Sequence, residues 1–125
     1  MTESKTLAKN LTETIFSLSE GIRYIALYTN EKLLTSFRED LLNASSSESD
    51  KYEELIVNPT LLKLVTQRGN IDCGGAEYVL IRYGNFYEFV KPLKKGHISV
   101  GIQLTEDPMI IIAAIENFLL NNNLV

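Results

Sequence analysis

Cysteine and histidine are almost absent from this chain of 125 residues. Cys73 is the only cysteine and His97 the only histidine, and neither has a partner at the spacing of a zinc site or of a nucleophile and its base. A single cysteine also excludes an internal disulfide, and the polar start MTESKTLAKN has no apolar core like that of a signal peptide. We therefore expect a cytoplasmic protein that is not an enzyme and that has no metal, no cofactor and no catalytic residues.

The chain also lacks a hydrophobic run that could cross a bilayer, which takes about 18 to 20 residues. The most apolar stretch, Met109–Leu120, is shorter and is interrupted by Glu116 and Asn117. An excess of positive charge is lacking too, because 12 Lys and Arg stand against 16 Asp and Glu and give a net charge of -4. Binding to phosphates usually requires a basic surface. We expect neither membrane insertion nor a nucleic-acid partner.

Three further groups of residues have simple structural interpretations. The glycine-rich segment Gly69–Gly75 precedes a predicted strand and lacks the Gly-Lys-Ser/Thr ending of a phosphate loop, so it predicts a flexible connection. The adjacent carboxylates Glu39-Asp40 and Glu53-Glu54 are typical of solvated faces, because sequence neighbours do not converge on one proton. A charged, solvated hairpin tip is expected where basic residues gather near the histidine: Arg82, Lys91, Lys94, Lys95 and His97.

What the chain does have is a periodic pattern in its first half. Apolar residues spaced by three and four predict a helix over Glu3–Ser19. Two strands, Ile22–Tyr28 and Lys32–Arg38, follow as a hairpin with a tight turn at Thr29-Asn30-Glu31. The small polar tract Asn43–Asp50 predicts a loop, after which Ser49 or Asp50 caps a second helix. Within that helix Pro59 predicts a kink or a second short helix, and Gly69 is expected to end it.

The second half predicts three strands and a helix. Glu77–Tyr83 and Phe86–Lys91 form a hairpin joined by a two-residue primed turn at Gly84-Asn85, and Pro92 is expected to end its second strand. Apolar residues alternate along Ile98–Leu104, which predicts a strand with one buried face. Asp107 and Pro108 are a typical helix start, followed by an apolar helix that runs to about Leu120.

The order of elements predicts the α+β class in one domain over residues 1–125: helix, two strands, helix, three strands, helix, with a five-stranded antiparallel sheet. Three segments of this chain, Ile22–Phe37, Tyr78–Pro92 and His97–Ile115, resemble the roadblock family of dynein light chains within the wider profilin-like and longin-like group. The likeness is nearest to small archaeal proteins of unknown function. It implies a non-catalytic dimer that serves as a platform for a Ras-like small GTPase or a larger complex.

The predicted third strand suggests how copies would pair. Its apolar run Tyr78–Ile81 would invite another chain if it lies at an open sheet edge. Five tyrosines, a residue type that favours interfaces, fall on predicted strands: Tyr24, Tyr28, Tyr78, Tyr83 and Tyr87. We expect a homodimer whose interface joins this strand to the second helix: Tyr52, Leu55, Ile56, Leu62, Val65, Tyr78, Leu80 and Tyr83.

The alternative is a small-molecule sensor of profilin-like or PAS-like architecture with a pocket between sheet and helix. The apolar alternation of Ile98–Leu104 speaks mildly against such a pocket.

Overall fold

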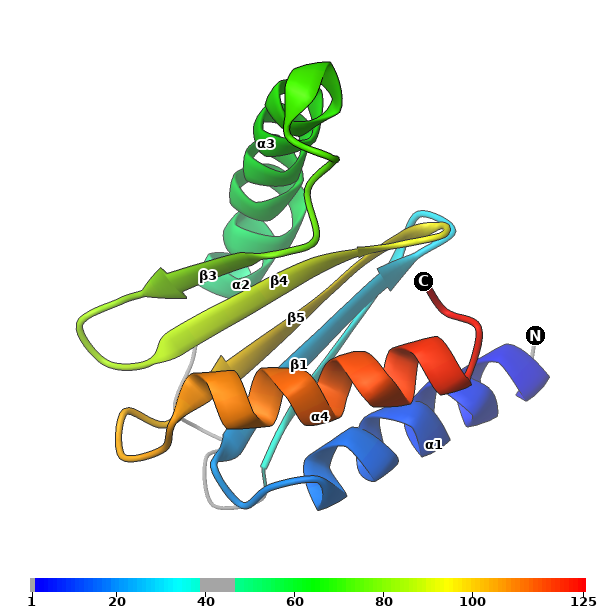
Figure 1. The fold of residues 1–125 in the computed structure, drawn as a ribbon. Coiled ribbons are helices and arrows are strands. Elements are labelled where there is room, and N and C mark those ends of the chain that lie inside the picture. Colours follow the sequence, from blue (N-terminus) through cyan, green and yellow to red (C-terminus); the bar gives the residue numbers. More distant parts are fainter. Residues whose placement is uncertain (1, 39–46) are drawn as a thin grey trace.

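The computed structural model of the protein describes residues 2–38 and 47–125, which form an α+β fold around a five-stranded antiparallel sheet (Figure 1). The strands lie in the order β2-β1-β5-β4-β3. This confirms the predicted class, element order and sheet. In chain order the elements are α1 (Thr2–Ser17), β1 (Ile22–Thr29), β2 (Lys32–Phe37), α2 (Ser47–Tyr52), the π-helical segment η2 (Glu53–Val57), α3 (Asn58–Asp72), β3 (Val79–Arg82), β4 (Tyr87–Leu93), β5 (Gly96–Ile102) and α4 (Pro108–Asn121).

Helices cover both faces of the sheet. α1 and α4 lie across one face, whereas α2, η2 and α3 lie on the other (Figure 1). Because side chains alternate along a strand, one set from β1, β4 and β5 packs toward α1 and α4. Each fully buried side chain of this core contributes roughly 1.5 to 3 kcal/mol of transfer free energy. The buried core comprises Ile15, Ile22, Ile25, Leu27, Phe89, Ile98, Val100, Ile102, Ile111, Ile112, Ile115 and Leu119.

Two local predictions are confirmed in detail. Asn30 and Glu31 both have positive φ, 52° and 68°, and form the two-residue primed turn of the first hairpin between Thr29 and Lys32. At the start of α4 the Asp107 side chain accepts a hydrogen bond from the backbone N–H of Met109 at 3.0 Å. No helix in the described part of the chain is long and apolar enough to cross a membrane.

The second helical region differs from the prediction at both ends. α2 begins at Ser47, before the expected caps Ser49 and Asp50, so residues 47–50 of the expected loop are helical and residues 43–46 lie outside the described residues. Gly69 does not end α3, which continues to Asp72. A Cβ at Gly69 would lie 2.8 Å from the backbone carbon of Gly75, so glycine is needed there for close packing of the following loop.

The interruption at Pro59 takes the form of a π-helical turn. Proline has no N–H to donate to the preceding turn, and its ring crowds the carbonyl four residues before it. The helix widens just ahead of it, where the Asn58 N–H bonds to the carbonyl of Glu53, and α3 then starts with Pro59 in its first turn. The predicted second helix near Pro59 is confirmed.

The last three strands also differ from their predicted bounds. β3 spans only Val79–Arg82, and neither Gly84 nor Asn85 has a positive φ, so the two-residue primed turn is wrong. The hydrogen bond from the Tyr83 N–H to the Phe86 carbonyl, at 2.9 Å, still leaves Gly84 and Asn85 as the two residues of the turn, but the turn is not of the primed type.

Pro92 does not end β4. The last pair between β3 and β4 at this end is Val79 with Val90, so no β3 residue lies opposite Pro92. The missing N–H of Pro92 therefore costs no hydrogen bond between β3 and β4. β5 begins at Gly96 and is buried from His97 to Ile102, on both faces rather than one.

Candidate functional site

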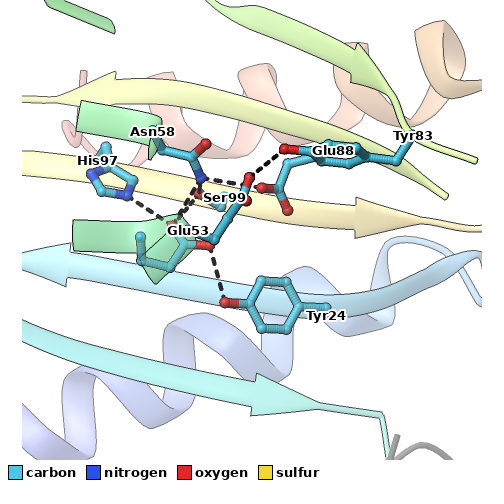
Figure 2. Close-up of polar contacts among 8 residues, drawn as sticks. Tyr24, Glu53, Asn58, Tyr83, Glu88, His97 and Ser99 are labelled. Atoms are coloured by element: carbon cyan, nitrogen blue, oxygen red, sulfur yellow. Dashed lines mark hydrogen bonds and ion pairs between the residues drawn. The ribbon is translucent and has the colours of Figure 1, made fainter. Parts of the chain in front are cut away.

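A group of polar side chains lies buried between η2 and the sheet. On β1, β4 and β5, the residues that alternate with the apolar core residues point away from that core. They enter this layer and meet side chains from the helices (Figure 2). We call this group the polar cluster: Tyr24, Glu53, Glu54, Asn58, Tyr83, Glu88, His97 and Ser99. Glu54, Asn58, Glu88, His97 and Ser99 are each at most 3% exposed.

Glu54 is the centre of the polar cluster. Its Oε1 accepts from Ser99 Oγ at 2.6 Å, from Asn58 Nδ2 at 3.2 Å and lies 2.9 Å from His97 Nε2. Its Oε2 accepts from the Tyr24 hydroxyl at 3.0 Å. Four polar groups thus converge on the two oxygens of one carboxyl group, and of those four only His97 can carry a positive charge.

The spacing of the helical residues explains how they reach the sheet. Glu54 and Asn58 are four residues apart, so both side chains project from the same side of the helical segment. Asn58 Nδ2 also lies 3.1 Å from Glu88 Oε2 and 3.0 Å from Ser99 Oγ. The Asn58 amide thus connects the helix to both β4 and β5. Its Oδ1 is buried with no hydrogen-bond partner among the described residues.

Glu88 is the second buried carboxyl group of the polar cluster. Burial raises the pKa of Glu88 to about 9, and a hydrogen bond to Glu53 and the nearby charge of Glu54 act in the same direction. Glu88 is therefore protonated at neutral pH. A neutral Glu88 removes one of the two like charges that would otherwise face the Asn58 amide.

The two tyrosines of the polar cluster each donate a hydrogen bond to a glutamate. Burial, followed by the charge of Glu54, raises the pKa of Tyr24. The Tyr83 hydroxyl donates to Glu53 Oε2 at 2.8 Å, and burial together with this bond raises the pKa of Tyr83. Both phenols therefore stay protonated and act as donors to carboxylates.

A shallow groove of about 360 Å³ lies beside the polar cluster, between α3 and the strand ends near the β4–β5 turn. His97 is the one residue that belongs to both. The groove is lined by Tyr28, Pro59, Leu62, Lys63, Thr66, Gln67, Pro92, Gly96 and His97. A second hollow of about 540 Å³ lies between the middle of α1, the C-terminal end of α4 and the turns at Thr29-Asn30 and Lys94-Lys95. Among the described residues, no three His, Cys, Asp or Glu side chains come together as a metal site would require.

Three sequence-based interpretations are wrong. His97 does not lie in a solvated turn, because it is part of β5 and 3% exposed. Glu54 is fully buried rather than solvated. Lys91 does not belong to an exposed basic tip, because it faces α4, where its Nζ lies 3.1 Å from Glu116 Oε2 and donates to the carbonyl of Glu77 at 3.0 Å. The other adjacent carboxylates, Glu39 and Asp40, lie outside the described residues.

The residues predicted to form a dimer interface fall into two groups. Tyr52, Leu55 and Ile56 are exposed on α2 and η2, and Tyr83 and Val65 are half-buried. By contrast, Leu62 is buried, and Tyr78 and Leu80 pack against the core, where the Tyr78 ring lies 5.3 Å from that of Phe89. The structure thus leaves Tyr52, Leu55 and Ile56 at the surface, buries Leu62, and places Tyr78 and Leu80 on the side of α1 and α4.

Comparison with known proteins adds no assignment. No protein-family model matches the chain, and no curated protein is significantly similar to it. What is established is a small α+β domain with a five-stranded antiparallel sheet.

Proposed function

We propose that the protein is a non-catalytic interaction module that forms a homodimer through β3 and the adjoining helices α2, η2 and α3. The observation that carries the proposal is the open edge of β3, together with the exposed apolar side chains of those helices. β3 is the last strand of the sheet, and no strand of the described residues pairs with its outer edge. An unpaired edge presents backbone donors and acceptors that another strand can bind.

Exposed apolar side chains on the helical layer support the same surface. Leu64 and Ile71 are 58% and 75% exposed, and their separation of seven residues places them on the same side of α3. Several large apolar side chains exposed on one layer of a small protein are typical of an interaction site. The large apolar side chains exposed on this layer are Tyr52, Leu55, Ile56, Leu64 and Ile71.

A second copy of the chain is the partner that fits this surface. Antiparallel pairing of two β3 edges about a two-fold axis would use the same backbone groups in each copy. It would also bring the acidic end of one β3 segment, at Glu77, to the basic end of the other, at Arg82. A stable dimer of this kind would bury at least about 1,000 Å² in total.

The roadblock-like element order supports a platform role for such a dimer. The resemblance implies a Ras-like small GTPase, or a larger complex, as the protein that the dimer would hold. Purification of the protein from native lysate with mass spectrometry tests this part of the proposal, which predicts a co-purifying GTPase.

Light scattering coupled to size exclusion at micromolar protein tests the dimer. The wild type should have the mass of two chains, and Ile71→Lys or Leu64→Lys should shift it toward one chain. Ile110→Lys is the matched control, because Ile110 is 70% exposed on α4, on the opposite face of the sheet. A monomeric wild type would refute the dimer. Leu80→Lys is a poor probe, since Leu80 packs against the core.

A further inference from the structure

We propose that the hollow between α1, the C-terminal end of α4 and the two neighbouring turns binds a small apolar molecule with one uncharged polar end. This inference is independent of the proposed homodimer, because the hollow lies on the face of the sheet that α1 and α4 cover, opposite α2, η2 and α3 (Figure 1). It rests on the apolar floor of the hollow, on the construction of its walls and on the residues at its mouth.

The floor of the hollow is apolar. Its volume of about 540 Å³ is within the range of about 300 to 1,000 Å³ that is usual for small-molecule sites. Leu27 belongs to the buried core, and the other apolar lining residues are partly buried and pack against that core. A ligand that enters therefore exchanges water for core side chains, which favours an apolar body. The apolar lining residues are Leu11, Leu27, Leu93, Phe118 and Leu124.

Backbone hydrogen bonds fix the walls of the hollow. The Asn30 N–H donates to the Lys95 carbonyl at 3.2 Å, which joins the two turns. After α4 the chain reverses at Asn123, whose φ is 58°, and runs back toward the strand ends (Figure 1). There the Lys94 N–H donates to the Leu124 carbonyl at 3.1 Å and holds the tail against the turn. The hollow is thus preformed, so a ligand does not have to order its walls.

The polar lining residues gather at the mouth of the hollow. Thr29 is half-buried, and every other polar lining residue is exposed. These exposed residues come from α1, from the two turns and from the end of α4 with the segment that follows it. A polar group carried down to the floor would lose its hydrogen bonds to water without replacement. The ligand is therefore bound with its apolar body inward and its polar end at the mouth.

The charges at the mouth favour an uncharged polar end over a cation. Lys94 and Lys95 are the only charged residues among those that line the hollow, and both are exposed. An ammonium group at the mouth would lie near two like charges. A carboxylate would gain little, because solvated lysines contribute little to an ion pair. The affinity thus comes from the apolar body, and a hydroxyl is the simplest polar end that fits.

Ligands of increasing chain length test the apolar floor. In protein with isotope-labelled leucine, titration with butanol, hexanol and octanol should shift the methyl signals of the lining leucines saturably. Each two added methylene groups should tighten binding by about fifteenfold while the hollow has room for them. Leu64, which is 58% exposed on α3, is the internal control, because its methyl signals report non-specific contact with an exposed apolar side chain.

Two charged ligands of the same chain length test the polar end. At low ionic strength octylammonium should bind at least about threefold more weakly than octanol, since the two lysines repel it. Octanoate should bind within about threefold of octanol. Equal binding of octylammonium and octanol, or octanoate binding tenfold or more tightly than octanol, would overturn the uncharged polar end.

A bulky side chain at the mouth should block the hollow. Thr14→Trp should weaken octanol binding by at least about tenfold. Glu13→Trp is the matched control, because Glu13 is also exposed on α1 but does not line the hollow. If Thr14→Trp does not melt cooperatively, Asn10→Trp, one helical turn earlier in the lining, replaces it.

The site is ruled out by any of four results: no saturable shift with octanol, equal shifts at Leu64, no gain in affinity with chain length, or equal binding by the blocked variant and Glu13→Trp. Ile71→Lys should bind octanol like the wild type, which separates this site from the dimer.

Discussion

Glu54 and Glu88 approach the same amide nitrogen, since Asn58 Nδ2 lies 3.2 Å from Glu54 Oε1 and 3.1 Å from Glu88 Oε2. The two carboxyl groups come from a helix and from β4, and both are almost completely buried. Two ionised carboxylates at this separation from one amide would repel each other in a poorly solvated space. One of the pair therefore holds a proton, and Glu88 is that group.

Protonation of Glu88 makes the stability of the fold depend on pH. Its pKa is about 9 in the folded protein against an ordinary value of 4.5, so between these values the folded state keeps a proton that the unfolded chain releases. Stability is then lost as pH rises through this window, with a slope of up to about 1.4 kcal/mol per pH unit. Glu88→Gln, which cannot ionise, should flatten this loss. Urea denaturation at pH 5, 7 and 9 measures it, with the exposed Glu106→Gln as control. Parallel pH profiles for the wild type and Glu88→Gln would disprove the assignment.

Loss of the central carboxylate should be more damaging than loss of charge alone. Glu54→Ala leaves the Tyr24 hydroxyl, the Asn58 amide, Ser99 and His97 without their common acceptor. We expect the free energy of unfolding to fall by about 3 to 5 kcal/mol, and by less for Glu54→Gln, which keeps an acceptor oxygen. Chemical denaturation of both variants beside Glu13→Ala, an exposed site on α1, provides the comparison. Equal stability of Glu54→Ala and Glu13→Ala would show that the polar cluster does not hold the helix to the sheet.

The apolar side of the sheet can be tested by two neighbouring isoleucines on α4. Ile112 is 1% exposed within the core, whereas Ile110 is 70% exposed. Ile112→Asp would bury an unpaired carboxylate and should unfold a domain whose total stability is about 5 to 15 kcal/mol. Ile110→Asp should leave the circular dichroism spectrum and the melting temperature nearly unchanged. Cooperative melting of Ile112→Asp at the wild-type temperature would contradict the packing of α4.

The sequence predicted the elements whose signals are local. The Asp107-Pro108 helix start, the turn at Asn30-Glu31 and the alternation of isoleucine and valine in β5 each depend on residues within a few positions of one another. Such signals are retained in the fold because backbone geometry and side-chain periodicity act over the same short distances. Element order and fold class followed from them.

The polar cluster could not be predicted because its partners are distant in sequence. Tyr24 and Glu54 are separated by 30 residues, and Glu54 and His97 by 43. Two lysines and a glycine before His97 suggested a solvated turn, and a second glutamate beside Glu54 suggested a solvated helix face. One signal was present: Ser99 shares the strand face of His97, opposite Ile98 and Val100, so a polar buried face of β5 could have been considered.

The π-helical turn before Pro59 has a consequence for sequence comparison. A ring closed between Glu53 and Asn58 contains one residue more than a regular helical turn, so η2 accommodates the equivalent of a single-residue insertion. A homologue with a regular helix here would align with a one-residue gap inside an otherwise unbroken helix. In such a homologue the angle around the helix axis between the counterparts of Glu54 and Asn58 would differ by about 100° from the angle in this chain. A search pattern for proteins with the same buried carboxylate should therefore allow the distance from Glu54 to the proline to vary by one residue.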